Sequence, residues 1–185
     1  MNDEALIGRC LSGDTEAFEG LVVAYQRPVY SLALRVTGNA DDAMDVAQEA
    51  FLKAFRSLPT FRRGSPFRPW LLAVTANTAT DFLRHKRPVA AGEALAADIP
   101  DVSPGPAELA EEGERNRRVR EAIMGLAPGY RILVELFHIQ GLSLAEVSAV
   151  TGLNVTVVKN RLFRARKMLR ERLAGVLANH TEGGG

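Results

Sequence analysis

Residues 141–167, Gly141-Leu-Ser-Leu-Ala-Glu-Val-Ser-Ala-Val-Thr-Gly-Leu-Asn-Val-Thr-Val-Val-Lys-Asn-Arg-Leu-Phe-Arg-Ala-Arg-Lys167, are the stretch from which the fold is best deduced. Ser143 and Glu146 have the spacing of a capping box, in which each side chain bonds a free backbone amide at a helix start. We therefore expect a short helix from Ser143 to about Val150.

A second helix should follow almost at once. Gly152 can adopt a positive φ where the first helix ends, and Asn154 is a good N-cap for a helix that reaches about Leu173. Two helices joined by so short a glycine-containing turn indicate a helix-turn-helix.

The second helix should divide its residues between two faces. One face is apolar and should pack on the domain: Val158, Leu162, Ala165 and Leu169. The opposite face is basic and carries one ring: Lys159, Asn160, Phe163, Arg164 and Lys167. A phenylalanine ring suits a thymine methyl, asparagine pairs with adenine, and arginine or lysine binds guanine or phosphate. The alternative is a basic, solvated amphipathic helix without a DNA role.

The charge alternates along the chain although the net charge of the 185 residues is only +1. Basic residues outnumber acidic ones by five over residues 61–88 and again over residues 159–185, whereas acidic residues are in excess by seven over residues 89–114. Two basic blocks separated by an acidic one suggest two places that meet a polyanion.

The N-terminal part should be helical, with breaks at Gly13, at Pro28 and at Gly38-Asn39, followed by a longer helix from about Asp41 to Ser57. That helix has an apolar stripe that includes Phe51 and Phe55. On its other face it has an acidic patch at i, i+3 and i+4: Asp45, Gln48 and Glu49. Such a patch is either solvated surface or a binding site for a basic partner.

Residues 59–70 break the helix with prolines and a glycine, yet they combine three aromatic rings with three arginines. Unstacked bases bind where rings or cations offer a stacking surface and charge meets the backbone. We expect Phe61 and the arginines to be available for such contacts, and Phe67 and Trp70 to lie in the core. A helix should follow from about Trp70 to His85.

Residues 89–106 lose the helical period and contain three prolines and two glycines, which indicates a flexible, acidic linker. The predicted fold is therefore all-α, with two small helical domains, residues 1–88 and 107–178, and a disordered tail at 179–185. The C-terminal domain should pack four helices, one of them from about Pro128 to Ile139, with Ile139 on its core face.

Several classes of function are disfavoured. The single Cys10 cannot form an internal disulfide, and with three scattered histidines it offers no metal site. We expect no cofactor and no catalysis, because no nucleophile with a matching base and no phosphate-binding glycine loop stands out. The N-terminus lacks a secretory signal and no apolar run is long enough to span a membrane, so we expect a cytoplasmic protein.

The sequence resembles the sigma factors of bacterial RNA polymerase, in particular the small extracytoplasmic-function (ECF, group 4) sigma factors of the sigma-70 family. The resemblance covers nearly the whole chain outside the linker. It rests on six stretches in the right order: Gly13-Asp-Thr-Glu-Ala-Phe18, Asp45-Val-Ala-Gln-Glu-Ala-Phe-Leu-Lys-Ala-Phe55, Phe61-Arg62 through Trp70-Leu71, Asn77 with Asp81 and Leu83-Arg84, Gly141-Leu-Ser-Leu-Ala-Glu146, and Val158-Lys-Asn-Arg-Leu-Phe-Arg-Ala-Arg166.

The resemblance implies a promoter-specificity subunit that binds core RNA polymerase, recognises the −35 and −10 elements and promotes strand opening. The acidic patch would bind the β′ clamp helices, and the β flap is a second implied contact. Residues implied to bind the −10 non-template single strand are Phe61, Arg62, Arg63, Asn77 and Arg84. Residues implied to bind the −35 duplex are Lys159, Asn160, Arg161, Phe163, Arg164, Arg166 and Lys167. Relatives are often held inactive by an anti-sigma factor, a partner that the sequence neither identifies nor excludes.

The chain departs from the family pattern at two places. Relatives commonly have Trp-Leu-Tyr-Arg-Ile-Ala before the asparagine, whereas this chain has Trp70-Leu-Leu-Ala-Val-Thr75. The contacts of the absent tyrosine and arginine to single-stranded DNA therefore cannot be carried over. Val157 stands where a threonine is usual, which would remove one phosphate hydrogen bond.

A stand-alone helix-turn-helix regulator is the alternative function. It would bind duplex DNA tightly without polymerase, usually as a symmetric dimer on a palindrome. No dimer-forming heptad is visible, and the loop of aromatic and arginine residues would then have no role.

Overall fold

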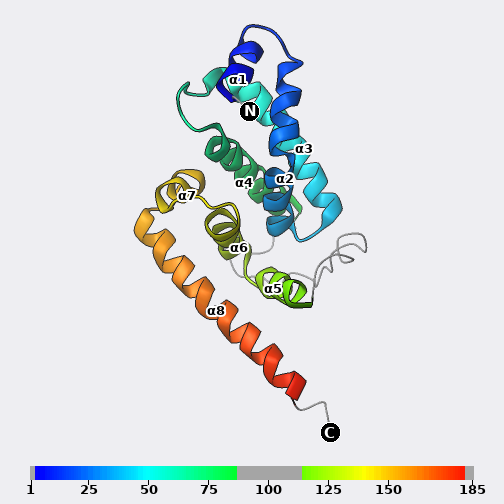
Figure 1. The fold of residues 1–185 in the computed structure, drawn as a ribbon, viewed down its shortest axis with the longest axis vertical. Coiled ribbons are helices and arrows are strands. Elements are labelled where there is room, and N and C mark those ends of the chain that lie inside the picture. The colour runs from blue at the N-terminus through cyan, green and yellow to red at the C-terminus, as the bar shows by residue number, and fades with distance from the viewer. Residues whose placement is uncertain (1–2, 87–113, 182–185) are drawn as a thin grey trace.

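The computed structural model describes the backbone of residues 3–86 and 114–181 and the side chains of residues 3–86 and 117–174. Every regular element in these stretches is a helix, which confirms the predicted all-α class (Figure 1). The helices form two regions, one on each side of residues 87–113. The predicted linker at 89–106 lies outside the described residues.

The first region contains four α-helices and a 3₁₀ turn. They are α1 (Asp3–Leu11), α2 (Ala17–Thr37), α3 (Ala40–Ser57), the 3₁₀ turn (Leu58–Thr60) and α4 (Phe67–Lys86). The expected break at Pro28 was wrong, because α2 runs through it. Proline removes one helical hydrogen bond, but Leu21 on one side of it and Val29 and Leu32 on the other are fully buried. Burial of the same helix face before and after the proline outweighs the lost bond.

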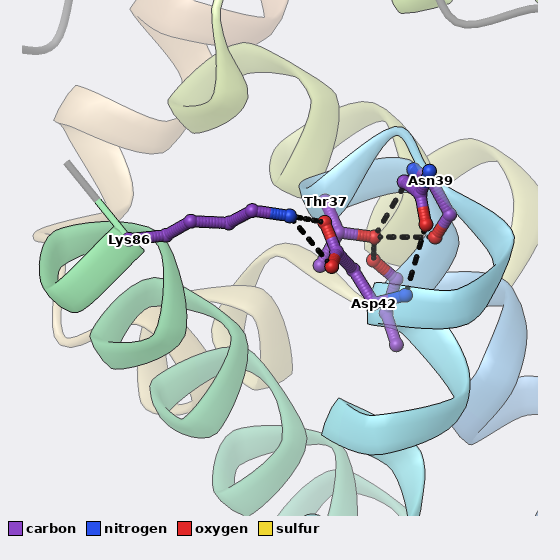
Figure 2. Close-up of polar contacts among 5 residues, drawn as sticks. Thr37, Asn39, Asp42 and Lys86 are labelled. Carbon is purple, nitrogen blue, oxygen red and sulfur yellow. Dashed lines mark hydrogen bonds and ion pairs between the residues drawn. The ribbon is translucent and has the colours of Figure 1, made fainter.

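The turn between α2 and α3 is fixed by polar contacts (Figure 2). Gly38 adopts a left-handed conformation with φ 76°, and the Asn39 side chain accepts a hydrogen bond of 3.0 Å from the Asp42 amide. The Thr37 hydroxyl donates to the Ala33 carbonyl at 2.9 Å. Lys86 Nζ lies 2.6 Å from a carboxylate oxygen of Asp42, which ties the end of α4 to the start of α3.

The second region contains the predicted helix-turn-helix. Its elements are α5 (Glu114–Met124), α6 (Pro128–Val134), a π-helical turn (Glu135–Ile139), α7 (Leu144–Thr151) and α8 (Val155–Thr181). Both halves of the capping box of α7 are formed, since the Glu146 amide donates to Ser143 Oγ at 3.2 Å and the Ser143 amide to Glu146 Oε2 at 2.8 Å. Gly152 ends α7 with φ 69°. The helix-turn-helix expected over residues 141–167 is thereby confirmed, although α8 extends beyond Leu173.

The helix expected over residues 128–139 is not uniform. After Val134 the backbone widens into the π turn, in which the Gln140 amide donates to the Glu135 carbonyl at 2.8 Å. The extra residue in this turn changes which side chains face inward. Ile139, expected in the core, is 46% exposed, whereas Glu135 and Gln140 are buried.

The described residues form three buried hydrophobic clusters, and the two regions share the largest of them. One cluster lies within the first region around Phe18, Leu21 and Leu71, and another lies among α5, α6 and α8. The largest cluster joins side chains of both regions: Leu32, Ala33, Val36, Ala43, Val46, Leu72, Ala76, Ala79, Leu133, Leu136, Leu142, Val147, Val150, Val158 and Leu162. Helix α4 packs on α7 and α2 packs on α6, so the helix-turn-helix is seated directly on the first region (Figure 1).

The capping box gives a stability prediction. Replacing Ser143 with Ala should lower the free energy of unfolding by about 1 kcal/mol, because an amide at the start of α7 loses its partner. The Ser143 hydroxyl also lowers the pKa of Glu146, so ionised Glu146 contributes stability at neutral pH that is lost as pH falls through its folded pKa. The variant should lose part of this acid dependence in urea denaturation measured at several pH values. The control is Thr156→Ala, which removes an exposed hydroxyl that follows the N-cap of α8. An equal loss of unfolding free energy in this control would contradict the cap assignment.

Candidate nucleic-acid interface

The apolar and the basic residues of α8 lie on opposite faces of the helix, as the sequence predicted. Val158 and Ala165 are fully buried and Leu162 is 3% exposed, so this face packs on the domain. The Asn154 side chain caps the helix by accepting from the Thr156 amide at 2.8 Å. The opposite face is open to solvent, and the Phe163 ring is 65% exposed there. Six of the seven residues predicted to bind duplex DNA are exposed, and Arg161 is partly buried.

Cations surround the exposed ring of Phe163. Together with Arg166, Lys167 and Arg170 it lines a surface hollow of about 260 Å³. Arg170 was not among the predicted residues, although its spacing of four from Arg166 places it on the same face. Lys167 also lies 3.9 Å from Glu171, but both side chains are well exposed, so this ion pair contributes little. The surface therefore combines an apolar centre with free positive charge.

His138 lies close enough to this surface to feel its charge. Partial burial, assisted by the positive charge of Arg166, lowers the pKa of His138 below its ordinary value. The imidazole is therefore neutral at neutral pH and adds no charge to the interface.

The residues of the loop between the 3₁₀ turn and α4 that we predicted to bind DNA differ in their exposure to solvent. Arg62 and Arg63 are exposed, whereas Phe61 is only 7% exposed. The Phe61 ring packs against Phe67 and Trp70, with centroid distances of 5.6 and 5.1 Å. Phe61, expected to be free for base stacking, thus lies with the core aromatics, and Trp70, expected in the core, is only partly buried. The reason is that α4 begins at Phe67, before the expected Trp70, with Pro69 in its first turn.

A hollow of about 340 Å³ opens beside this loop. Phe61, Ile7 and Arg63 line it together with the acidic Asp3 and Glu4 of α1. Sequence reasoning missed these acidic residues because no local signal relates the N-terminus to the loop. Tyr25 donates to Asp3 at 2.5 Å, and burial together with this hydrogen bond raises the pKa of Tyr25 to about 12. Tyr25 thus remains a donor that holds α1 against α2.

The remaining predicted single-strand residues lie on α4. Asn77 and Arg84 are both exposed and are separated by two helical turns, so they share one face. Arg84 forms an exposed ion pair of 2.9 Å with Asp81. An exposed pair of this kind is weak and exchanges readily for a phosphate.

The acidic patch of α3 is accessible and has apolar neighbours. Asp45 and Gln48 are exposed, and Glu49, with its side chain 45% exposed, lies 3.8 Å from Lys53. Exposed apolar side chains on the same helix were not predicted as part of the site: Met44 at 66%, Leu52 at 44% and Phe55 at 38%. The sequence placed Phe55 in the buried stripe, and its ring does touch Phe18 with a centroid distance of 5.0 Å. A surface that mixes acidic and apolar groups suits a basic partner with apolar side chains.

Two further properties concern the described residues only. Their Asp, Glu, His and Cys side chains form no group of three that could hold a metal ion. None of the helices within residues 3–86 and 114–181 is long and apolar enough to cross a membrane.

Comparisons with known proteins relate both regions of the chain to known families. Residues 21–89 match the family model of sigma-70 region 2, and residues 116–169 match that of sigma-70 region 4. The chain is 36% identical to the RNA polymerase sigma-H factor of Pseudomonas aeruginosa, over 95% of both chains. It is 35% identical to the ECF RNA polymerase sigma-E factor of Escherichia coli, over 91% of this chain and 93% of that protein.

A solved structure supports the same relationship. CnrH, in complex with the cytosolic domain of CnrY, superposes with a TM-score of 0.70 at 29% identity, over 94% of this chain and 97% of CnrH. Both regions of the chain and the relatives that span nearly its whole length point to one family. The chain belongs to the extracytoplasmic-function sigma factors of the sigma-70 family, the promoter-recognition subunits of bacterial RNA polymerase.

Proposed function

We propose that this sigma factor reads the upstream promoter element with α8 and the downstream element with the loop at residues 61–66 and the exposed face of α4. The observation that carries the proposal is the exposed α8 surface, in which the Phe163 ring stands among cations. The proposed functional units are residues 1–88 and 107–178, joined by a linker over 89–106. Of the tail predicted at 179–185, residues 179–181 continue α8.

In the −35 duplex, α8 would enter the major groove. Asn160 and Arg164 can form bidentate contacts with adenine and guanine, and Phe163 can contact a thymine methyl. The other cations of this face, Lys159, Arg161, Arg166 and Lys167, would neutralise phosphates and set the register of the helix.

In the −10 element, the non-template strand would follow Arg62, Arg63, Asn77 and Arg84. The hollow beside the loop has room for an unstacked base, and the largely buried Phe61 forms part of its wall. Capture of such a base would offset part of the free energy needed to unpair it, so binding and strand opening would be coupled.

The polymerase contact would lie on α3. Asp45, Gln48 and Glu49 supply the negative and polar groups for the basic β′ clamp helices, and Met44 and Leu52 supply apolar contact area. The β flap would bind the helix-turn-helix region. In this function the chain performs no catalysis itself and needs no cofactor. Its partners place it in the cytoplasm, where an anti-sigma factor could also bind it.

The first test is reconstitution. The purified chain should form a stable complex with bacterial core polymerase and transcribe members of a promoter library, while neither component does so alone. The selected promoters should share a two-part motif. Strong binding to duplex DNA without core, together with failure to bind core, would favour a stand-alone regulator instead.

Arg164 should specify one base pair of the upstream element. Replacing Arg164 with Ala should cost about 1–3 kcal/mol of discrimination at that position, because a bidentate contact to the base is lost. Transcription from promoters that carry all four bases at each upstream position measures this loss. Arg170→Ala, six residues further along α8, is the control that should leave base preference unchanged. A uniform loss over all promoters in Arg164→Ala would identify a phosphate contact.

Glu49 should be essential for binding polymerase. Replacing Glu49 with Lys places a positive charge against the basic clamp helices and should abolish co-purification with core. The fold should persist, because Glu49 is substantially exposed and makes only a loose ion pair. Glu19→Lys applies the same charge change to an exposed position of α2 and should leave binding intact. Unchanged co-purification of Glu49→Lys would contradict the assignment.

A further inference from the structure

The N-terminal helix α1 forms one wall of the hollow beside the loop at residues 61–66. Buried apolar side chains line part of the hollow: Ile7, Phe61 and Phe67. Polar groups come from both the loop and α1: Arg63, Ser65, Asp3 and Glu4. An occupant of the hollow would therefore meet apolar side chains together with hydrogen-bond donors and acceptors.

Helix α1 is packed closely against its neighbours. A Cβ on Gly20 would lie 3.1 Å from a side-chain carbon of Leu6, so this glycine leaves room for α1 beside α2. A Cβ on Gly8 would lie 3.1 Å from Nη2 of Arg63. The guanidinium of the loop thus lies against α1 at a position that has no side chain. Helix and loop are therefore held together as one wall.

One of the two acids in this wall is held by a hydrogen bond. Tyr25 donates to Asp3 Oδ2 at 2.5 Å, and Oδ1 accepts no hydrogen bond from the described residues. Glu4 is exposed, and its side chain forms no hydrogen bond or ion pair within the described part of the chain. A carboxylate that is held through one oxygen presents the other as an acceptor at a fixed place. Asp3 is thus the positioned acceptor of the hollow.

The opposite charges that line the hollow do not pair with one another. Arg63 forms no ion pair with Asp3 or Glu4, nor with any other acid that the structure describes, although the three residues share the hollow. A guanidinium only donates hydrogen bonds, and a carboxylate only accepts them. A planar group that carries an acceptor and a protruding donor on one edge would satisfy both.

The four bases differ in what their edges offer to such a wall. Adenine, cytosine and guanine each carry an exocyclic amino group, which is a protruding donor, and an acceptor on the same edge. Thymine has no amino group, and its one ring N–H lies between two carbonyl oxygens. A carboxylate would repel those oxygens. An acid in the wall therefore favours the three bases with an amino group over thymine.

We propose that Asp3, positioned by Tyr25, accepts a hydrogen bond from the exocyclic amino group of the unpaired base in the hollow. One position of the downstream element then discriminates against thymine. This inference rests on the proposed capture of a non-template base beside the loop. Asp3 and Glu4 also lie in the first turn of α1, where acids stabilise a helix. Stabilisation of the helix alone would not depend on which base is present.

Selection of transcribed promoters from a library that is randomised over the downstream element tests the preference. Holoenzyme with the wild-type chain should select against thymine at one position. Asp3→Asn keeps an oxygen for Tyr25 but replaces the carboxylate with an amide, so thymine should gain about tenfold at that position. Tyr25→Phe should lose part of the discrimination, because Asp3 is then no longer held. Helix content by circular dichroism should be unchanged in both variants.

Glu4→Gln is the matched control. It removes the same charge from the same hollow, but from a side chain that nothing holds. The preference among bases should therefore stay as in the wild type.

Removal of the amino group from the base tests the contact itself. The selected base of the non-template strand is replaced by its analogue without that group: purine for adenine, 2-pyrimidinone for cytosine or hypoxanthine for guanine. With the wild-type chain this change should weaken open-complex formation about tenfold. With Asp3→Asn it should have little further effect, because the same hydrogen bond is already absent.

Four results would overturn the inference. They are transcription by the wild type without selection against thymine, equal selection in the wild type and Asp3→Asn, an equal change in Glu4→Gln, and an analogue effect of the same size with and without the Asp3 carboxylate. All four leave the proposed function intact, because the holoenzyme still transcribes. If the wild-type holoenzyme transcribes no promoter, the proposed function fails, and the role of Asp3 fails with it.

Discussion

Glu135 has no contact with solvent, so each of its hydrogen bonds must come from inside the protein. Its partners Ser31 and Arg35 lie on one face of α2, and a shift of α2 by one residue would turn them away from the carboxylate. Apolar packing in the shared cluster tolerates small displacements of the helices. The hydrogen bonds of Glu135 do not, because they require their partners at fixed positions. A polar group therefore determines where the helix-turn-helix is seated, and the surrounding apolar side chains supply most of the stabilisation.

The parts of the structure that the sequence predicted are those with local causes. The capping box depends on Ser143 and Glu146, which are three residues apart. The left-handed conformation of Gly152 depends only on the absence of a side chain at that residue. Likewise, the spacing of Val158, Leu162 and Ala165 is sufficient to orient α8 and so to expose Phe163. For this reason the helical period identifies the exposed face of α8, whereas the assignment of its residues to the −35 element comes from the family resemblance.

The features that sequence reasoning missed depend on distant contacts. Pro28 lies within α2 because the core buries that helix on both sides of it, and the π turn after Val134 turns Glu135 toward partners on α2. Phe61 is buried because Phe67 and Trp70 form a cluster around it. None of these partners is visible from the local pattern, and the docking of the two regions across residues 87–113 leaves no periodic signal in either.

The shared core also has a consequence for synthesis of the chain. Helices α1–α4 leave the ribosome first. Leu72 and Ala76 of α4 become buried only when side chains such as Leu136 and Val147 emerge and pack against them. During that interval a nascent N-terminal half carries an uncovered apolar face. Sequences that slow translation after residue 86 would prolong this exposure, and a truncated chain that ends there would be prone to aggregate through that face.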